Sequence, residues 1–179
     1  LYAVKNIYAW DSKDKASQEA IALVAKAMNT KVCDDLPSAT IKLGIGYWRK
    51  ANAIHAWFVK NVQDGIDECQ ASTVSVEQLK TLRSVCQQVL DSTEMVKGKR
   101  YAGSTYNSDG TTTDEYVDGD VVAETSIART ALPTTSGFFF GSTDYDEYYI
   151  NDLQRTIKII DAALKLADEH TTYEYRASW

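Results

Sequence analysis

Four residues between positions 48 and 55 carry the most specific chemistry in the sequence. Trp48, Asn52 and His55 follow one another at steps of four and then three residues, so in a helix they line up along one side. The tryptophan supplies a stacking plane, the other two supply hydrogen-bond donors and acceptors, and Arg49 supplies a forked donor for a carboxylate or phosphate. Together they predict a site for a small anionic or nucleotide-like ligand. The alternative is structural: His55 would hydrogen-bond a neighbouring helix, Asn52 would brace the core, and Arg49 would pair with an acidic residue of the last helical stretch.

A second segment, residues 137–147, is expected to form the other wall of that pocket. Its aromatic residues lead into Ser142 and Thr143 at an expected helix N-terminus, where free backbone N–H groups favour anions. Tyr145 is expected to add a second stacking plane. The segment is not a phosphate-binding P-loop, because Gly141 stands where that motif has its lysine. The alternative is that it only caps the helix.

Groups that could react are few. His55 and His170 are the only histidines, and neither belongs to a metal motif such as HExxH. The cysteines lack metal-ligand or CxxC spacing, which is typical of buried reduced thiols; they are Cys33, Cys69 and Cys86. We therefore predict no metal, no cofactor and no catalytic residue. An enzyme that uses His55 or Cys69 is kept as the last hypothesis.

Helical periodicity marks four stretches that are expected to position these residues. They cover residues 12–28, 45–62, 75–90 and 143–167. The third has the best-marked start, because Ser75 and Gln78 have the spacing of a capping box. Thr143 and Asp146 repeat that spacing at the fourth.

Composition changes between the third and fourth stretches. Residues 98–135 are rich in Thr, Ser, Gly and Asp, and the turn signal at 107–110 lies between weakly alternating runs at 101–106 and 111–117. This pattern predicts a β-hairpin, with 121–123 as a candidate third strand. We therefore expect a mainly α fold: one domain over 1–179, built as a compact bundle of roughly four helices, with a β-rich acidic insertion at 98–135.

The charge and hydropathy of the sequence limit the kinds of partner and location that we expect. The net charge is −6, and it is uneven: residues 1–99 hold 13 basic and 11 acidic residues, whereas 100–179 hold 6 and 14. A negative net charge repels the phosphate backbone of nucleic acids, so no nucleic acid polymer is expected as a partner. The sequence contains no apolar run that is long enough for a membrane span or a signal peptide. A cytoplasmic location is therefore expected. The 11 Tyr and 4 Trp make homo-oligomerisation plausible.

Two strings resemble segments of an uncharacterised protein family encoded by tailed bacteriophages. They are GYWRKANAIHAWFVKNVQDGIDEC at 46–69 and LPTTSGFFFGSTDYDEYYINDL at 132–153. The closing residues 173–179 are also similar, whereas the stretch from 98 to 130 departs from the family, which has a shorter connection there. The resemblance implies a viral accessory protein in the cytoplasm of an infected bacterium.

Three hypotheses follow from these observations. The first is a non-enzymatic phage protein that binds a small anionic or nucleotide-like ligand and so sequesters a host-defence signal. The second is a protein-interaction or structural component that binds a host protein through the acidic insertion and exposed aromatic residues. The third is an enzyme that depends on His55.

Overall fold

The computed structural model describes residues 1–9, 14–32, 37–137 and 141–178. Within these residues the protein has an α+β fold with 39% helix and 28% strand, in five helices and two antiparallel sheets. The prediction of a mainly α bundle is therefore wrong. Cys33, the phenylalanines at 138–140, the expected helix start at Ser12 and the final Trp179 lie outside the described residues.

The elements follow one another in a mixed order. They are β1 (Tyr2–Tyr8), α1 (Lys15–Ala27), β2 (Ser38–Gly44), α2 (Asn52–Val62), β3 (Ser72–Val74), α3 (Val76–Asp91), β4 (Met95–Tyr106), β5 (Thr112–Val122), α4 (Ser126–Ala131), α5 (Glu147–Lys165) and β6 (Thr171–Tyr175).

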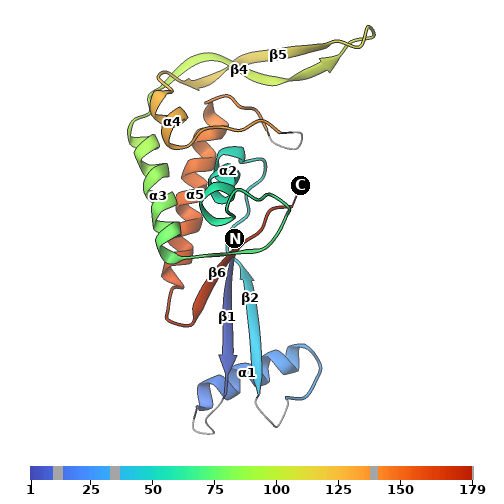
Figure 1. Ribbon diagram of the computed structural model, residues 1–179, viewed down its shortest axis with the longest axis vertical. Coiled ribbons are helices and arrows are strands. Elements are labelled where there is room, and N and C mark those ends of the chain that lie inside the picture. Colours follow the sequence, from blue (N-terminus) through green and yellow to red (C-terminus); the bar gives the residue numbers. More distant parts are fainter. Residues whose placement is uncertain (10–13, 33–36, 138–140, 179) are drawn as a thin grey trace.

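A four-stranded antiparallel sheet, in the order β2-β1-β6-β3, was missed by the helical interpretation. Its central strands, β1 and β6, come from the two ends of the described chain, and Ala3 of β1 pairs with Tyr173 of β6. On the other side of β1, Ala3 pairs with Leu43 of β2. In Figure 1, β1 and β2 run together away from the helices, and α1 lies across their far ends. Local periodicity could not reveal this sheet, because its pairings join segments far apart in the sequence.

The helical body packs α3 against α5, with α2 beside them (Figure 1). The core contains side chains that are almost completely buried, such as Phe58, Leu82, Leu153 and Ile160. The predicted capping box of α3 is confirmed: Ser75 Oγ accepts from the N–H of Gln78, whose side chain accepts from the N–H of Ser75. The capping box expected at Thr143 and Asp146 for the last long helix, α5, is wrong. The N-cap is Asp146, so this helix begins later than predicted.

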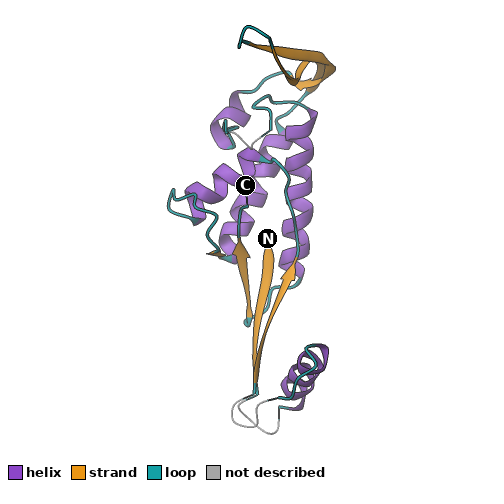
Figure 2. Ribbon diagram, turned by 90° about the vertical axis from the view of Figure 1, so that its right-hand side faces the viewer, coloured by secondary structure: helices purple, strands orange, loops and turns teal. Residues whose placement is uncertain are grey.

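The hairpin predicted around the turn at 107–110 is confirmed and is longer than expected. Strands β4 and β5 form a two-stranded arm that projects from the top of the body (Figures 1 and 2). The expected third strand at 121–123 is wrong, since Val121 and Val122 end β5. Cross-strand ion pairs join Lys97 to Asp120 and Lys99 to Asp118, so basic residues of β4 offset part of the acidic charge of β5.

The second predicted helix starts seven residues later than expected. It begins at Asn52, and the backbone of Lys50 has a φ of 59°, a left-handed conformation that ends any helical path from Tyr47. Trp48 and Arg49 therefore lie in the connection before α2 and not on its face. The predicted alignment of Trp48 with Asn52 and His55 along one helix is therefore wrong.

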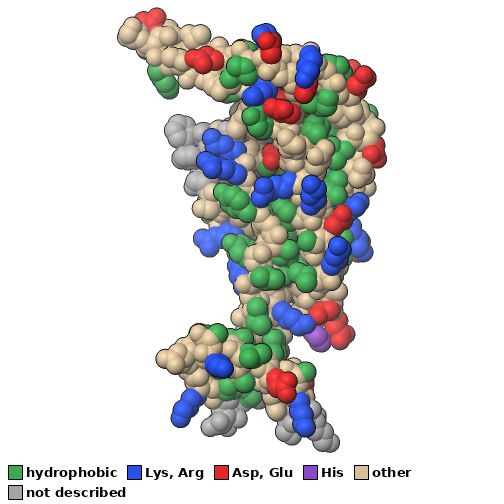
Figure 3. Space-filling view, turned by 180° about the vertical axis from the view of Figure 1, so that it is seen from behind, with side chains coloured by type: hydrophobic (Ala, Val, Ile, Leu, Met, Phe, Trp, Pro, Cys, Tyr) green, Lys and Arg blue, Asp and Glu red, His purple; other side chains and the backbone are tan. Residues whose placement is uncertain are grey.

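The molecule is elongated, with a waist between the helical body and the lobe formed by α1 and the outer ends of β1 and β2. Figure 3 shows this waist from behind, with apolar side chains continuing from the body into the lobe. No helix in the described part of the chain is long and apolar enough to cross a bilayer.

Candidate ligand-binding clefts

Two clefts lie on either side of the connection before α2, and Arg49, Lys50 and Ala51 border both of them. The first, which we name the Trp48 cleft, has a volume of about 900 Å³ and lies between residues 44–51, the start of α2 and residues 175–178. The second, the Asp152 cleft, has a volume of about 960 Å³ and lies between the connection, the middle of the β4–β5 arm and the start of α5.

The Trp48 cleft is basic and aromatic. Three cationic side chains border it, from Arg49, Lys50 and Arg176, and no Asp or Glu belongs to its described lining. The basic side chains come from both ends of the sequence, since Arg176 follows β6. Tyr47, which is 68% exposed, and Trp48 also border the cleft. None of these lining groups carries a negative charge that would repel an anion. The rings of Tyr47 and Trp48 are surfaces on which a flat ligand ring can stack.

Trp48 is held in place by its polar edge. Its indole N–H donates to the hydroxyl of Thr156 on α5 at 2.8 Å, so the ring is anchored to the helical body. The ring packs at a tilt against Phe58, with a centroid distance of 5.7 Å, and against Tyr175 at 6.4 Å. Trp48 remains only partly buried, so this fixed ring forms a rigid wall of the cleft.

His55 lies in a hydrogen-bonded row with Asp67 and Tyr175. Its Nε2 is 2.9 Å from Oδ2 of Asp67, and its Nδ1 is 2.8 Å from the hydroxyl of Tyr175. Burial, followed by the charge of Asp67, raises the pKa of Tyr175 well above its usual value. Tyr175 therefore stays protonated at neutral pH. Both ring nitrogens of His55 are engaged, which orients the imidazole beside the cleft.

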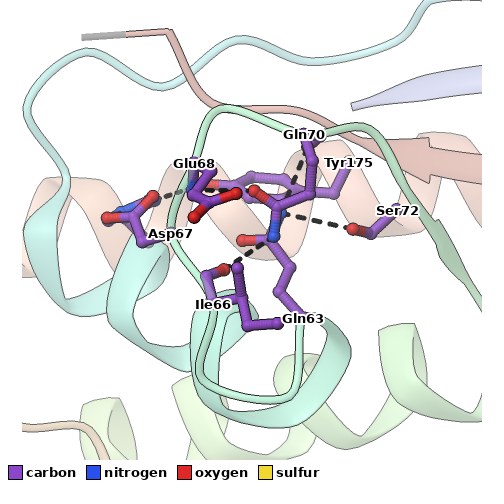
Figure 4. Close-up of polar contacts among 8 residues, drawn as sticks. Gln63, Ile66, Asp67, Glu68, Gln70, Ser72 and Tyr175 are labelled. Atoms are coloured by element: carbon purple, nitrogen blue, oxygen red, sulfur yellow. Dashed lines mark hydrogen bonds and ion pairs between the residues drawn. The ribbon is translucent and has the colours of Figure 1, made fainter.

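The loop that carries Asp67 is braced by glutamine side chains (Figure 4). Nε2 of Gln63 donates to the carbonyl of Gln70 at 3.2 Å and to the hydroxyl of Ser72 at 3.3 Å. Nε2 of Gln70 donates to the carbonyl of Ile66 at 2.7 Å. These bonds hold the loop against α2, and so they fix the position of the carboxylate that contacts His55.

Asn52 joins the two sequence strings, and it also borders the Asp152 cleft. It is 5% exposed; its Nδ2 donates to the carbonyl of Ser142 at 2.9 Å, and its Oδ1 accepts from the N–H of Thr135 at 3.1 Å. Both ends of the amide are therefore occupied by backbone groups. This is the bracing role that the sequence left open as the alternative, and it makes Asn52 a positioning residue.

The structure separates the predicted residues of the second wall, which are Ser142, Thr143 and Tyr145. Trp48 and His55 border the Trp48 cleft, whereas Ser142 and Thr143 border the Asp152 cleft. Tyr145 does not: it is 8% exposed, its ring meets Tyr149 edge-on at 4.9 Å, and it belongs to the described lining of neither cleft. Tyr145 therefore cannot serve as the stacking plane of either cleft.

Several cleft residues were missed by reasoning from the sequence; they are Lys50, Arg100, Asp146, Asp152 and Arg176. Asp152 had a detectable signal. It lies between Tyr149 and Leu153 on α5, next to the apolar stripe, where a carboxylate is unusual. Arg176 had none, because only the pairing of β6 with β1 brings its position beside the connection before α2.

The two described cysteines differ in burial. Cys86 is fully buried in α3, and burial raises the pKa of its thiol to about 12, which keeps it neutral. Cys69 is partly buried in the loop before β3. No group of three or more His, Cys, Asp or Glu side chains in the described part of the protein is arranged to hold a metal ion.

Comparison with protein-family models, with curated proteins and with solved structures gives no match to this chain.

Proposed function

We propose that this protein binds a small anionic ligand that carries a flat ring, such as a nucleotide, in the Trp48 cleft. The observation that carries the proposal is the composition of the cleft: three cations, an anchored tryptophan and no carboxylate in its described lining. The chain as a whole has a net charge of −6, so this group of positive charges is opposite in sign to the average charge of the protein.

The proposal assigns separate roles to the lining residues. Arg49 and Arg176 bind the anionic group, because a guanidinium offers paired N–H donors that match phosphate or carboxylate oxygens. Trp48 stacks on the ring, and Lys50 adds a point charge. The phage origin and the infected-cell cytoplasm expected from the resemblance remain predictions beside this proposal.

Isothermal titration calorimetry with three probes tests the pairing of charge and ring. AMP carries both features, ribose 5-phosphate carries only the charge, and adenosine carries only the ring. We expect AMP to bind at least tenfold more tightly than either fragment, and its affinity to fall as salt rises. The proposal is abandoned if AMP shows no saturable heat at millimolar concentrations, or if the two fragments bind as well as AMP.

Matched variants locate the site. Arg176→Ala and Arg49→Ala are each expected to weaken AMP binding by about 10- to 150-fold, in line with a charged hydrogen bond of roughly 1.5–3 kcal/mol. Lys60→Ala is the control, since Lys60 is an exposed cation on α2 that borders neither of the two clefts. Equal loss in all three variants would point to a diffuse charge effect and not to this cleft.

The second candidate function is protein binding by the β4–β5 arm. Residues 104–118 are all exposed, and Tyr106 at the outer end of β4 is 84% exposed. We propose a test in which residues 104–114 are replaced by a two-residue turn. Loss of a partner in pull-down, with an unchanged melting temperature, supports this function. Light scattering of the wild-type protein shows whether the partner is a second copy.

A further inference from the structure

The Asp152 cleft contains carboxylates that the described chain leaves short of hydrogen-bond donors. Asp146 is 1% exposed. Its Oδ1 accepts from the N–H groups of Tyr148 at 2.9 Å and Tyr149 at 3.1 Å, as the N-cap of α5. Its Oδ2 has no partner among the described residues. A buried carboxylate oxygen without a donor is unfavourable and is uncommon in folded proteins.

Asp152 borders the same cleft and is short of donors too. Within the described chain no hydrogen bond reaches its carboxylate. Burial raises its pKa to about 6, against the opposing effect of Arg155, and the charge of Asp146 raises it further. The pKa of Asp146 is also raised, chiefly by burial. Asp152 therefore lacks the N–H donors that would favour its charged form, whereas Asp146 has such donors at Oδ1 only.

The charges around these two residues favour a cationic group. Two further carboxylates border the cleft, Asp114 and Asp144. Of the three cations there, Arg100 is already 3.4 Å from Glu147, while Arg49 and Lys50 also border the Trp48 cleft. An aromatic side chain is available as well. Tyr148 is 57% exposed, and its ring already has the Arg100 guanidinium 4.8 Å from its centroid.

The geometry favours an N–H cation over a metal ion. A metal ion needs several oxygen ligands at once, and no group of three or more suitable side chains is arranged for one in the described structure. An ammonium or guanidinium group needs only one or two acceptors within hydrogen-bond distance. A partly exposed carboxylate, Asp152, and a buried one, Asp146, border the same cleft and meet that requirement.

We propose that the Asp152 cleft binds the ammonium or guanidinium end of a small ligand, with Asp152 accepting its N–H groups and Asp146 supplying a second negative charge. This site is separate from the anion site of the Trp48 cleft. Its residues come from α5 and its N-cap, and it does not depend on the proposed function.

Nuclear magnetic resonance titration of the ¹⁵N-labelled protein at pH 7.5 tests the proposal with three probes of similar size: n-butylamine, n-butylguanidine and n-butanol. We expect saturable shifts of the backbone amides of residues 148–153 with the two cations and not with the neutral alcohol. Absence of saturable shifts with the cations, or equal shifts with n-butanol, overturns the proposal. Magnesium chloride is titrated in parallel, and tighter binding of Mg²⁺ at these amides overturns it in favour of a metal site.

Variants separate this site from the anion site. Asp152→Asn is expected to weaken butylamine binding at least tenfold and to leave AMP binding unchanged, whereas Arg176→Ala is expected to do the reverse. Asp161→Asn is the matched control, because Asp161 lies on the same helix but pairs with Arg83, away from the cleft. Unchanged butylamine binding by Asp152→Asn contradicts the proposal.

A measurement on the wild-type protein covers the case in which the variant fails to fold. Carbon-13 detection of the Asp152 carboxyl gives its pKa with and without saturating butylamine. We expect the bound cation to lower this pKa. The same pKa in both samples rejects the contact, whatever the variant does.

Discussion

The side-chain amide of Asn52 donates to the backbone carbonyl of Ser142 at 2.9 Å, across 90 residues of sequence. The same side chain accepts from the N–H of Thr135, so one buried amide joins the start of α2 to the chain on both sides of residues 138–140. This contact brings together the two strings on which the phage resemblance depends. Their proximity therefore has a packing cause, whether or not they bind a ligand.

Asn52→Ala is expected to destabilise the protein by about 2–3 kcal/mol, because it leaves the Ser142 carbonyl and the Thr135 N–H without their partner. Urea unfolding followed by circular dichroism measures the change. Asn61→Ala is the matched control: Asn61 is an exposed residue of the same helix whose side-chain amide donates to the carbonyl of Trp57 in that helix, and a change within about 0.5 kcal/mol is expected. A comparable loss in both variants would contradict the bracing role.

Gly46 is predicted to tolerate no side chain, since an ideal Cβ at this position would lie 2.2 Å from Cγ2 of Ile159. Gly46→Ala is expected to lower the free energy of unfolding by about 1–3 kcal/mol. Gly44→Ala is the control, because its nearest neighbour would be an atom of Tyr2 at 3.8 Å, an ordinary contact. Ile159→Ala in the Gly46→Ala background should recover part of the loss, measured as non-additivity in a double-mutant cycle.

Lys50 combines an unfavourable backbone conformation with a position between the two clefts. Lys50→Gly is expected to raise the free energy of unfolding by about 0.5–1 kcal/mol, because glycine adopts the left-handed conformation without steric cost. Lys60→Gly, within α2, is expected to lower it by about 1 kcal/mol. AMP affinity should fall only in the first variant. Loss of stability in Lys50→Gly would show that its side chain contributes to packing.

The stability of the protein should depend on pH through Asp152. Burial raises its pKa in the folded state to about 6 from 3.8, so ionisation costs stability as pH rises from 4 through 6. Asp152→Asn should therefore match the wild type near pH 4 and be more stable by about 1 kcal/mol at pH 8, an amount reduced by solvent that still reaches the carboxylate. Unfolding measured across this range checks the sign. Lower stability of the variant at pH 8 would mean that the charged carboxylate is favoured.

Local signals in the sequence predicted the elements whose contacts are local. The capping box at Ser75 and Gln78 marked the start of α3, and the turn at 107–110 marked the hairpin, because in both cases the partners lie within a few residues. The sheet was missed for the opposite reason. Strand β1 pairs with residues 38–44 and 171–174, and no local pattern specifies such partners.

The candidate site divides in the same way. By itself the sequence determined which residue types were available near position 50: a tryptophan, an arginine, an asparagine and a histidine, each able to recognise a flat or anionic group. Only the tertiary structure decided how these groups are used. A left-handed turn at Lys50 separates Trp48 from α2, backbone groups occupy Asn52, and the pairing of β6 brings Arg176 beside the connection before α2. Side-chain chemistry is a local property, whereas burial and charge environment depend on residues far away in the sequence.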